Sequence, residues 1–358
     1  MTENKGSGPE SSGQTVRRKS EHIRICLEEP VQSLGIETGF QYYRFRHCAL
    51  PEIAFNDVDI SGPFLGLPLR APLLISSMTG GTEEAGSINS RLAEAAEARG
   101  WAMGLGSMRA VIENEQLAGT FRVRREAPTI PLIANLGAVQ LNYGYGVDQC
   151  RRAVELAEAN ALVLHLNSLQ EVFQAEGDTN FRGLLERIGE VCRQIGVPVG
   201  IKDVGWGIDA ETAARLADAG VSFIDVAGAG GTSWSQVEKH RSRDPLRAAA
   251  AAAFADWGIP TAECVREVRV RLPQTCIIAS GGLNTGVDAA KAIALGADIA
   301  GFGRSLLAGA AASEDGQAGP ETLYNQLERI EFELRTAMFG IGAATLSQLR
   351  GTDRLMMR

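Results

Sequence analysis

A cluster of polar side chains lies at the carboxyl end of the short apolar run at residues 161–166. The cluster consists of His165, Asn167, Gln170 and Glu171. Residues two apart in a strand share a face, so His165 and Asn167 point the same way, while Gln170 and Glu171 fall in the next loop. A lone histidine in such a run is more often a core residue, but four polar groups at one strand end favour a site. Glu171 is a hard oxygen ligand suited to Mg²⁺ bridged to a phosphate.

Lys202 ends another apolar run, at residues 197–201, and a lysine at a buried strand end is seldom structural. It could form a Schiff base with a carbonyl substrate, which requires desolvation to lower its pKa. The neighbouring Asp203 opposes that lowering. Alternatively, the positive charge of Lys202 could hold the edge of an anionic ring. The residue pattern leaves both chemistries open.

Three glycine-rich segments also follow apolar runs. Gly281-Gly282 and Gly303-Arg304 close the two strands of a β-α-β unit at residues 275–306, and residues 228–232 read Gly-Ala-Gly-Gly-Thr. Glycines let backbone N–H groups approach an anion or a flat ring, and a helix N-terminus adds positive charge. The spacing of a dinucleotide-binding Rossmann motif is absent. The pattern therefore indicates a phosphate site of the kind that follows strands seven and eight of a barrel.

A scaffold that gathers these residues must bring many strand ends together. Eight apolar runs alternate with stretches of helical periodicity, which predicts an α/β protein with a closed (β/α)8 TIM barrel. The runs are residues 71–76, 102–105, 131–134, 161–166, 197–201, 221–226, 276–279 and 299–302. The long spacing from residue 230 to residue 262 predicts an enlarged loop after strand six. Polar residues at nearly every strand end predict an enzyme.

The chain boundaries follow from composition. Residues 1–16 are rich in small and polar residues and are predicted to be a disordered tail. Residues 17–350 are predicted to form one barrel domain with an N-terminal lead-in, and residues 351–358 a C-terminal tail. Arg18 and Lys19 are either solvated residues at a helix start or an anion clamp. Basic residues near a helix N-terminus are unfavourable unless an anion compensates them, which favours the clamp.

Charge and cysteine content limit the partners and the compartment. The 358 residues carry a formal net charge of −8, with an isoelectric point near 5.3, which argues against a general nucleic-acid binder. No run is long enough to cross a membrane, and the N-terminus has no apolar signal core. The six cysteines form no CxxC pair and are expected to be free thiols in a reducing compartment. These features predict a cytoplasmic protein without membrane or nucleic-acid partners.

Taken together, the motifs resemble the type 2 isopentenyl-diphosphate isomerases, a family of FMN-dependent barrels. The likeness runs in order from about residue 17 to residue 350. The matching stretches are Arg18-Lys19-x-Glu21-His22, Met78-Thr79-Gly80-Gly81, Leu105-Gly106-Ser107, Ile133-Ala134-Asn135-Leu136-Gly137, His165-Leu166-Asn167-x-x-Gln170-Glu171, Lys202-x-Val204-Gly205, Val226-Ala227-Gly228-Ala229-Gly230-Gly231-Thr232-Ser233-Trp234 and Ser280-Gly281-Gly282.

The resemblance implies interconversion of isopentenyl and dimethylallyl diphosphate, with FMN, Mg²⁺ and NADPH as the reductant of the flavin. The implied FMN contacts are Met78, Thr79, Ser107, Asn135, Lys202, Thr232, Gly281 and Gly282. The implied diphosphate contacts are Arg18, Lys19, Arg109, His165, Asn167 and Gln170. Glu171 matches the Mg²⁺ ligand, and Glu238 matches a glutamate near the same site, although from the residues alone it is equally a surface charge.

The resemblance also bears on assembly and on one departure from the family pattern. It implies a homo-oligomer, a tetramer or octamer, with the Arg18-Lys19 pair supplied at or near a subunit boundary. Asp203 stands where the family usually has Glu. The side chain is shorter by one methylene, which is expected to loosen a contact to Lys202.

The implied chemistry moves a double bond by adding one proton and removing another, without net redox change. Such chemistry on an unactivated alkene needs a strong, well-placed acid and exclusion of water. Gln170, Asn167 and His165 are the catalytic candidates, and none is an obvious strong acid. The resemblance therefore implies that N5 of the reduced flavin carries the proton, with Lys202 near its N1/O2 edge. We expect Gln170 to orient or assist the transfer.

Two other functions fit a barrel of this kind. One is an FMN-dependent 2-hydroxy-acid oxidase, but those enzymes carry a catalytic histidine and arginine in the loop after strand six. Here that loop reads GAGGTSW and the first histidine beyond it is His240. The other is a non-catalytic flavin- or phosphate-binding barrel, against which the set of polar strand ends argues.

Overall fold

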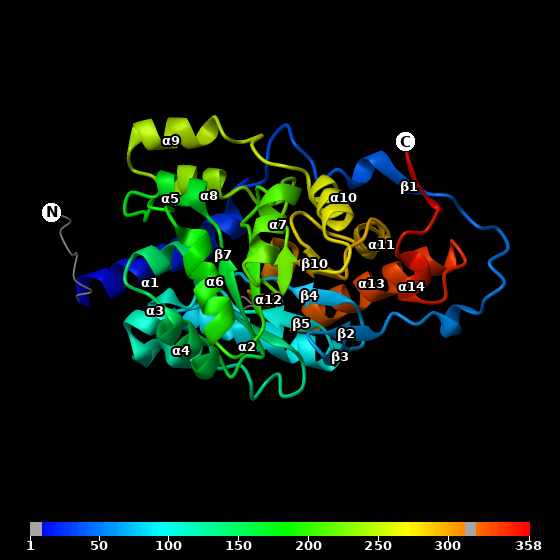
Figure 1. Cartoon of the computed structure of the whole chain (residues 1–358), viewed down its shortest axis with the longest axis horizontal. Coiled ribbons are helices and arrows are strands. Elements are labelled where there is room, and N and C mark those ends of the chain that lie inside the picture. The colour runs from blue at the N-terminus through cyan, green and yellow to red at the C-terminus, as the bar shows by residue number, and fades with distance from the viewer. Residues whose placement is uncertain (1–8, 312–319) are drawn as a thin grey trace.

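Eight parallel strands form a closed barrel, as predicted, in the computed structural model, which describes residues 9–311 and 320–358 (Figure 1). Around the barrel the strands follow the order β10-β11-β4-β5-β6-β7-β8-β9. Their bounds are β4 (Leu73–Ile75), β5 (Ala102–Gly104), β6 (Leu132–Gly137), β7 (Ala161–His165), β8 (Val199–Lys202), β9 (Phe223–Asp225), β10 (Cys276–Ala279) and β11 (Ile299–Phe302). Each lies within or overlaps one predicted run. The strands are short and almost entirely buried, which is why they read as continuous apolar runs.

The helices cover the outside of the barrel (Figure 1). Their bounds are α2 (Glu83–Arg99), α3 (Arg109–Glu113), α4 (Val147–Ala157), α5 (Ser168–Phe173), α6 (Leu184–Gln194), α7 (Ala210–Asp218), α10 (Thr261–Arg271), α11 (Gly286–Ala294), α12 (Arg304–Ala310), α13 (Pro320–Phe339) and α14 (Leu346–Leu349). Short 3-10 helices lie at Phe40–Tyr42, Phe55–Asp57, Glu115–Thr120 and Ala138–Asn142. None of the helices in the described ranges is both long enough and apolar enough to cross a membrane.

The enlarged loop after the sixth barrel strand is confirmed and contains two helices, α8 (Trp234–Arg241) and α9 (Pro245–Ala252). Asp244 caps α9 by accepting the Leu246 N–H at 2.9 Å, and Pro245 occupies its first turn. Both helices pack over the carboxyl end of the barrel, where α8 contacts α1 (Pro9–Glu28) and α5.

A hairpin closes the amino end of the barrel. Strands β2 (Gly62–Phe64) and β3 (Leu67–Leu69) pair through a tight turn in which Leu65 and Gly66 have positive φ. Phe64 inserts among the inward-facing residues of the barrel strands and meets the ring of Phe223 edge-on, with 5.9 Å between centroids. Both aromatic side chains are fully buried. The amino end is therefore a packed core.

Both predicted tails differ from the structure. Residues 1–8 lie outside the described residues, but the helix that carries Arg18 and Lys19 begins at Pro9, well before the predicted residue 17. Arg18 and Lys19 consequently lie in mid-helix, so the helix-start argument for them is wrong. At the other end, β12 (Leu355–Met357) pairs antiparallel with β1 (Tyr43–Phe45). Three apolar residues were too short a signal to predict this strand.

Glu331 makes a buried contact between α13 and α2 that is expected to be important for stability. It accepts the Trp101 Nε1–H at 2.7 Å and pairs with Arg99. Glu331→Ala leaves the Trp101 N–H without an acceptor and Arg99 with only the exposed Glu328 among the described residues, and we expect the free energy of unfolding to fall by about 3 kcal/mol. Glu328→Ala removes an exposed partner of the same Arg99 and is expected to cost less than about 1 kcal/mol. Urea unfolding measures both values, and equal losses would contradict this role.

Candidate active site

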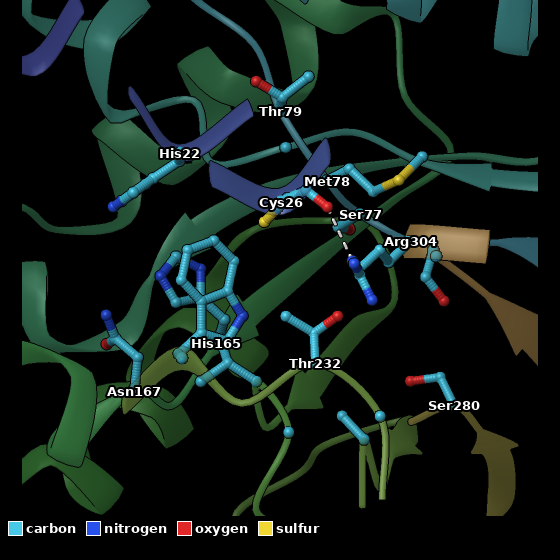
Figure 2. Close-up of a pocket in the computed structure, with 18 of the residues that line it drawn as sticks. His22, Cys26, Ser77, Met78, Thr79, His165, Asn167, Thr232, Ser280 and Arg304 are labelled. Atoms are coloured by element: carbon cyan, nitrogen blue, oxygen red, sulfur yellow. Dashed lines mark hydrogen bonds between the residues drawn. The ribbon is translucent and has the colours of Figure 1, made fainter. Parts of the chain in front are cut away.

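One cavity of about 460 Å³ opens at the carboxyl ends of the barrel strands, and all predicted site residues line it. These residues are Arg18, Lys19, Met78, Thr79, Ser107, Arg109, Asn135, His165, Asn167, Gln170, Glu171, Lys202, Thr232, Gly281 and Gly282. Figure 2 shows His165 and Asn167 on one side of the cavity and Ser280 and Arg304 on the other. The cavity thus has a polar wall after β7 and a second wall formed by the loops after β10 and β11.

Helix α1 lies across the mouth of this cavity. Arg18 donates to Gln174 Oε1 at 2.8 Å, and Lys19 donates to the Ser107 carbonyl at 2.6 Å. Near its other end the Cys26 carbonyl accepts from Arg304 Nε at 2.8 Å, as Figure 2 shows. Arg18 and Lys19 therefore face the cavity of their own chain, which excludes the alternative of two solvated residues at a helix start.

Lys19 is buried and its ammonium lies 5.2 Å from the centroid of the Phe121 ring. Burial and the neighbouring Arg18 lower the pKa of Lys19 to about 7. The lysine is thus close to losing its charge at neutral pH. A polyanion beside it would restore that charge, because opposite charges favour the ionised form.

His165 is a neutral imidazole in this structure. Its Nδ1 lies 2.7 Å from Asn135 Oδ1, which is an acceptor, so Nδ1 carries the proton and Nε2 has the free lone pair. Burial, followed by the charges of Lys202, Lys19 and Arg18, lowers its pKa to about 3. His165 therefore does not act as a strong acid near neutral pH.

Gln170 is tied to a buried carboxylate that the sequence did not distinguish from a surface charge. Its Nε2 donates to Glu238 Oε1 at 3.2 Å, and His22 Nε2 lies 3.0 Å from the same oxygen. Arg241 Nε donates to the other oxygen at 2.8 Å. Burial opposes ionisation of Glu238, but His22 and Arg241 outweigh it and lower its pKa to about 2. The alternative of an exposed charge at Glu238 is therefore wrong, since the residue is 1% exposed.

Glu171 is also buried, and both of its oxygens accept hydrogen bonds. Asn167 Nδ2 donates to Oε1 at 2.7 Å, and the Asp178 N–H donates to Oε2 at 2.7 Å. Asn167 Oδ1 is buried and has no hydrogen-bond partner among the described residues. Within the described ranges, no group of three or more His, Cys, Asp or Glu residues is arranged so that it could hold a metal ion. Two hard oxygen donors at one edge fit Mg²⁺, which commonly takes only one or two carboxylates besides waters and phosphate oxygens.

Arg109 lines the cavity, but two carboxylates already hold its guanidinium. Nε donates to Glu113 at 2.7 Å and Nη1 donates to Asp178 at 2.8 Å. Gln140 also donates to Asp178, at 3.0 Å. An incoming anion must therefore share Arg109 with acidic partners. Among the described residues, Arg18 bonds to the amide oxygen of Gln174 and pairs with a more distant carboxylate, that of Glu176, at 3.8 Å.

Lys202 and Asp203 are arranged differently from the prediction. Lys202 Nζ donates at 2.8 Å to the backbone carbonyl of Asp203, not to its side chain. The Asp203 carboxylate instead accepts the N–H groups of Gly205, Trp206 and Gly207 at 2.9, 2.6 and 3.0 Å. The expectation that the shorter Asp loosens a contact to Lys202 is therefore wrong, because the contact uses the backbone.

The glycine loops pack so closely that they form a backbone cradle. A Cβ added at Gly281 would lie 2.2 Å from the Gly228 carbonyl, and one at Gly231 would lie 2.5 Å from the Gly282 nitrogen. Gly281 and Gly282 both have positive φ, at 105° and 79°. Successive backbone N–H groups in such loops form concave anion sites. The buried Ser76 hydroxyl, without a partner among the described residues, also lines this wall.

A family profile and several known proteins match this chain over most of its length. The profile of a family described as FMN-dependent dehydrogenase matches residues 146–355, more than half of the chain. An isopentenyl-diphosphate delta-isomerase from Oceanobacillus iheyensis is 54% identical over 95% of this chain and 95% of its own. The protein of the same name from a Nostoc species is 52% identical, with 96% and 97% covered. The chain belongs to the isopentenyl-diphosphate delta-isomerase family.

Solved structures show the same barrel beyond this isomerase family. An (S)-mandelate dehydrogenase superposes with a TM-score of 0.67 at 18% identity, covering 98% of both chains. A lactate oxidase from Pediococcus acidilactici gives a TM-score of 0.66 at 17% identity, covering 98% of this chain and 94% of its own. At these identities the likeness establishes the fold alone.

Several cavity residues were not assigned a role from the sequence. Gln174 receives Arg18, Arg304 holds α1, and His22 meets Glu238. Their partners come from segments far apart in the chain, so neither spacing nor periodicity could pair them. His22 carried a usable signal because it belongs to the Arg-Lys-x-Glu-His stretch, and Arg304 carried one because it closes a predicted strand, but Gln174 carried none.

Proposed function

We propose that this chain interconverts isopentenyl diphosphate and dimethylallyl diphosphate, using FMN, Mg²⁺ and NADPH as the reductant of the flavin. One observation carries the proposal: one cavity joins a backbone cradle after β9 and β10 to a cationic pair on α1, and no strong acid is among the described residues that line it. Membership of the isopentenyl-diphosphate delta-isomerase family supports the activity, and the FMN-dependent profile supports the cofactor.

The diphosphate is assigned to the wall beneath α1. Arg18 and Lys19 supply charge, and Asn167 and Gln170 supply amide hydrogen bonds. Glu171 and the free oxygen of Asn167 would hold Mg²⁺ on the same wall, where it would neutralise phosphate oxygens. His165 donates its Nδ1–H to Asn135 Oδ1, so its Nε2 can only accept a hydrogen bond.

The opposite wall is assigned to FMN. The glycine cradle would receive its phosphate, and Thr79, Ser107, Asn135, Lys202 and Thr232, with Met78, would contact the ring system and ribityl chain. When bound and reduced, FMN would supply the proton-transfer chemistry that the side chains lack. Gln170, held by Glu238, would orient the reacting carbon against it.

The decisive experiment incubates purified protein with isopentenyl diphosphate, FMN, Mg²⁺ and a catalytic amount of NADPH without oxygen. NMR identifies the product. Dimethylallyl diphosphate formed in excess over NADPH is the expected result. No product from reduced, FMN-loaded protein would refute the proposal, and flavin reduction by a 2-hydroxy acid would replace it with the oxidase function.

The geometry of the enlarged loop disfavours the oxidase. His240, the first histidine after GAGGTSW, lies on α8 and faces Glu29 at 3.6 Å. It does not line the cavity. A histidine base acting on a hydroxy acid must reach the proton that it abstracts. Residue 240 does not provide such a base.

The remaining proposals concern assembly and compartment. We infer a homo-oligomer of four or eight chains from the family resemblance. A cytoplasmic location is supported by the six cysteines, all of which are free thiols. Size-exclusion chromatography with light scattering would measure the assembly.

Lys19 is expected to make diphosphate binding depend on pH. In the free protein the Lys19 ammonium is lost as the pH rises through about 7. Above that pH, binding of the anion must be coupled to protonation of Lys19, which weakens the apparent affinity. The dissociation constant of inorganic diphosphate should therefore rise above pH 7 by up to about tenfold per unit, relative to Lys19→Arg. Calorimetric titration of both proteins from about pH 6 to pH 9 measures this. Parallel pH profiles would show that Lys19 keeps its charge throughout.

A further inference from the structure

Asp225 is a buried carboxylate to which no role has yet been given. It is 3% exposed and ends β9, between β8 and β10. In the barrel register Lys202 is its neighbour on one side and Ile278 on the other. A charged residue at the end of the apolar run Phe223–Val226 is costly to bury unless it has partners.

Three donors surround this carboxylate. Ser280 Oγ donates to Oδ1 at 2.6 Å, and the Ala227 N–H donates to the same oxygen at 3.3 Å. Lys202 Nζ lies 3.8 Å from Oδ2. Burial raises the pKa of Asp225, and the charge of Lys202 and the bond from Ser280 oppose that rise. The two recorded hydrogen bonds and the ammonium all favour an ionised carboxylate.

Two partners hold the Lys202 ammonium, and its remaining N–H donors are available to the cavity. An ammonium has three N–H donors. One is bonded to the Asp203 carbonyl, and Asp225 attracts the group from below. A second, small cavity of about 10 Å³ is lined by both Lys202 and Asp225, at the lower limit of the space one water needs. Little solvent can therefore screen the pair.

We propose that Asp225 is a positioning residue that holds the Lys202 ammonium directed into the cavity, where its charge would stabilise the negative charge of reduced FMN. The proposal rests on the proposed function for the place of FMN. Asp225 itself contacts Lys202 and Ser280 and acts through them. Ser280 fixes the carboxylate by a short hydrogen bond, and it links the strand ends of β9 and β10.

The physical reason lies in the state that precedes flavin reduction. A neutral oxidised ring offers the Lys202 ammonium no opposite charge that would hold it in one position. The Asp225 carboxylate supplies the missing charge from within the barrel. When the ring becomes negative, Lys202 is already charged and in place, so no group has to move.

The test measures the affinity of the protein for oxidised and reduced FMN in four variants. In Asp225→Asn the ratio of reduced to oxidised affinity should fall by about tenfold, which lowers the two-electron midpoint potential by about 30 mV. In a Lys202→Met background the same change should have no further effect, because Asp225 acts through Lys202. Asp298→Asn, at the amino end of the barrel, is the control for lost stability and should leave the ratio unchanged.

An unchanged or higher ratio in Asp225→Asn, or an equal fall in the Lys202→Met background, would overturn the proposal. If Asp225→Asn does not fold, Ser280→Ala replaces it. That variant loosens the carboxylate without removing its charge, so a fall of about threefold that disappears in the Lys202→Met background is expected. A constant ratio there would equally refute the role. Because the readout needs FMN but not turnover, a protein that binds FMN and lacks isomerase activity would refute the proposed function alone.

Discussion

Gln170→Asn is expected to lower kcat by about 10²-fold or more while KM changes by less than about threefold. The amide sits 8% exposed in the cavity wall, and Nε2 donates to Glu238, which His22 and Arg241 hold in turn. Shortening the side chain by one methylene keeps the amide but withdraws it from this oxygen. Gln170 also gives the diphosphate one neutral hydrogen bond, whose loss changes KM only modestly, whereas the loss of its orienting role during proton transfer lowers kcat.

A matched variant separates orientation from binding. Gln174→Asn makes the same truncation four residues along, where the amide oxygen accepts from Arg18. Its effect should fall on KM, because Arg18 belongs to the diphosphate wall. Steady-state assays of both variants give the comparison. Full turnover by Gln170→Asn would exclude the orienting role. Equal effects of the two variants on KM would show that the two amides do not differ in their contribution to substrate binding.

Glu171→Gln is expected to abolish most of the stimulation by Mg²⁺ and to lower kcat/KM by about 10²- to 10³-fold. The substitution preserves size and leaves an oxygen that can still accept from Asn167, but it removes the charge that a divalent cation needs. Activity measured against Mg²⁺ concentration should give a much higher half-saturating value, with no recovery at saturation.

The control for this variant is Glu176→Gln. Glu176 does not line the cavity, pairs with Arg241 at 2.9 Å and lies 3.8 Å from Arg18, whose main partner is Gln174 at 2.8 Å. Loss of this partly exposed ion pair should change kcat/KM by less than about fivefold. If Glu171→Gln retained the Mg²⁺ dependence of the unchanged protein, the metal site would have to lie elsewhere.

The barrel could be predicted from the sequence because its strands are buried on both faces and therefore appear as apolar runs. Many residues that line the cavity could be predicted because they lie at strand ends, where runs such as 161–166 stop and polar residues begin, and their roles there stay predictions. Helix α1 was placed less well. Its first turns are polar and resemble a tail, and its packing partners Gln174 and Arg304 are distant in the chain.

Long-range partners limit prediction in a second way. Asp203 stood beside Lys202 in sequence and was expected to act on it through the side chain, but that side chain caps the loop at 205–207. Asp225, twenty-odd residues further on, is the carboxylate that faces the ammonium. Strand register brings the two together, and register cannot be obtained from apolar runs alone.

The hairpin that inserts Phe64 into the barrel also limits the route of ligands. Because it fills the amino end, the cavity opens at the carboxyl end and does not run through the barrel. A product formed inside must leave along the route by which the substrate entered. Isopentenyl and dimethylallyl diphosphate therefore exclude one another from the same entrance, and each should inhibit the conversion of the other competitively.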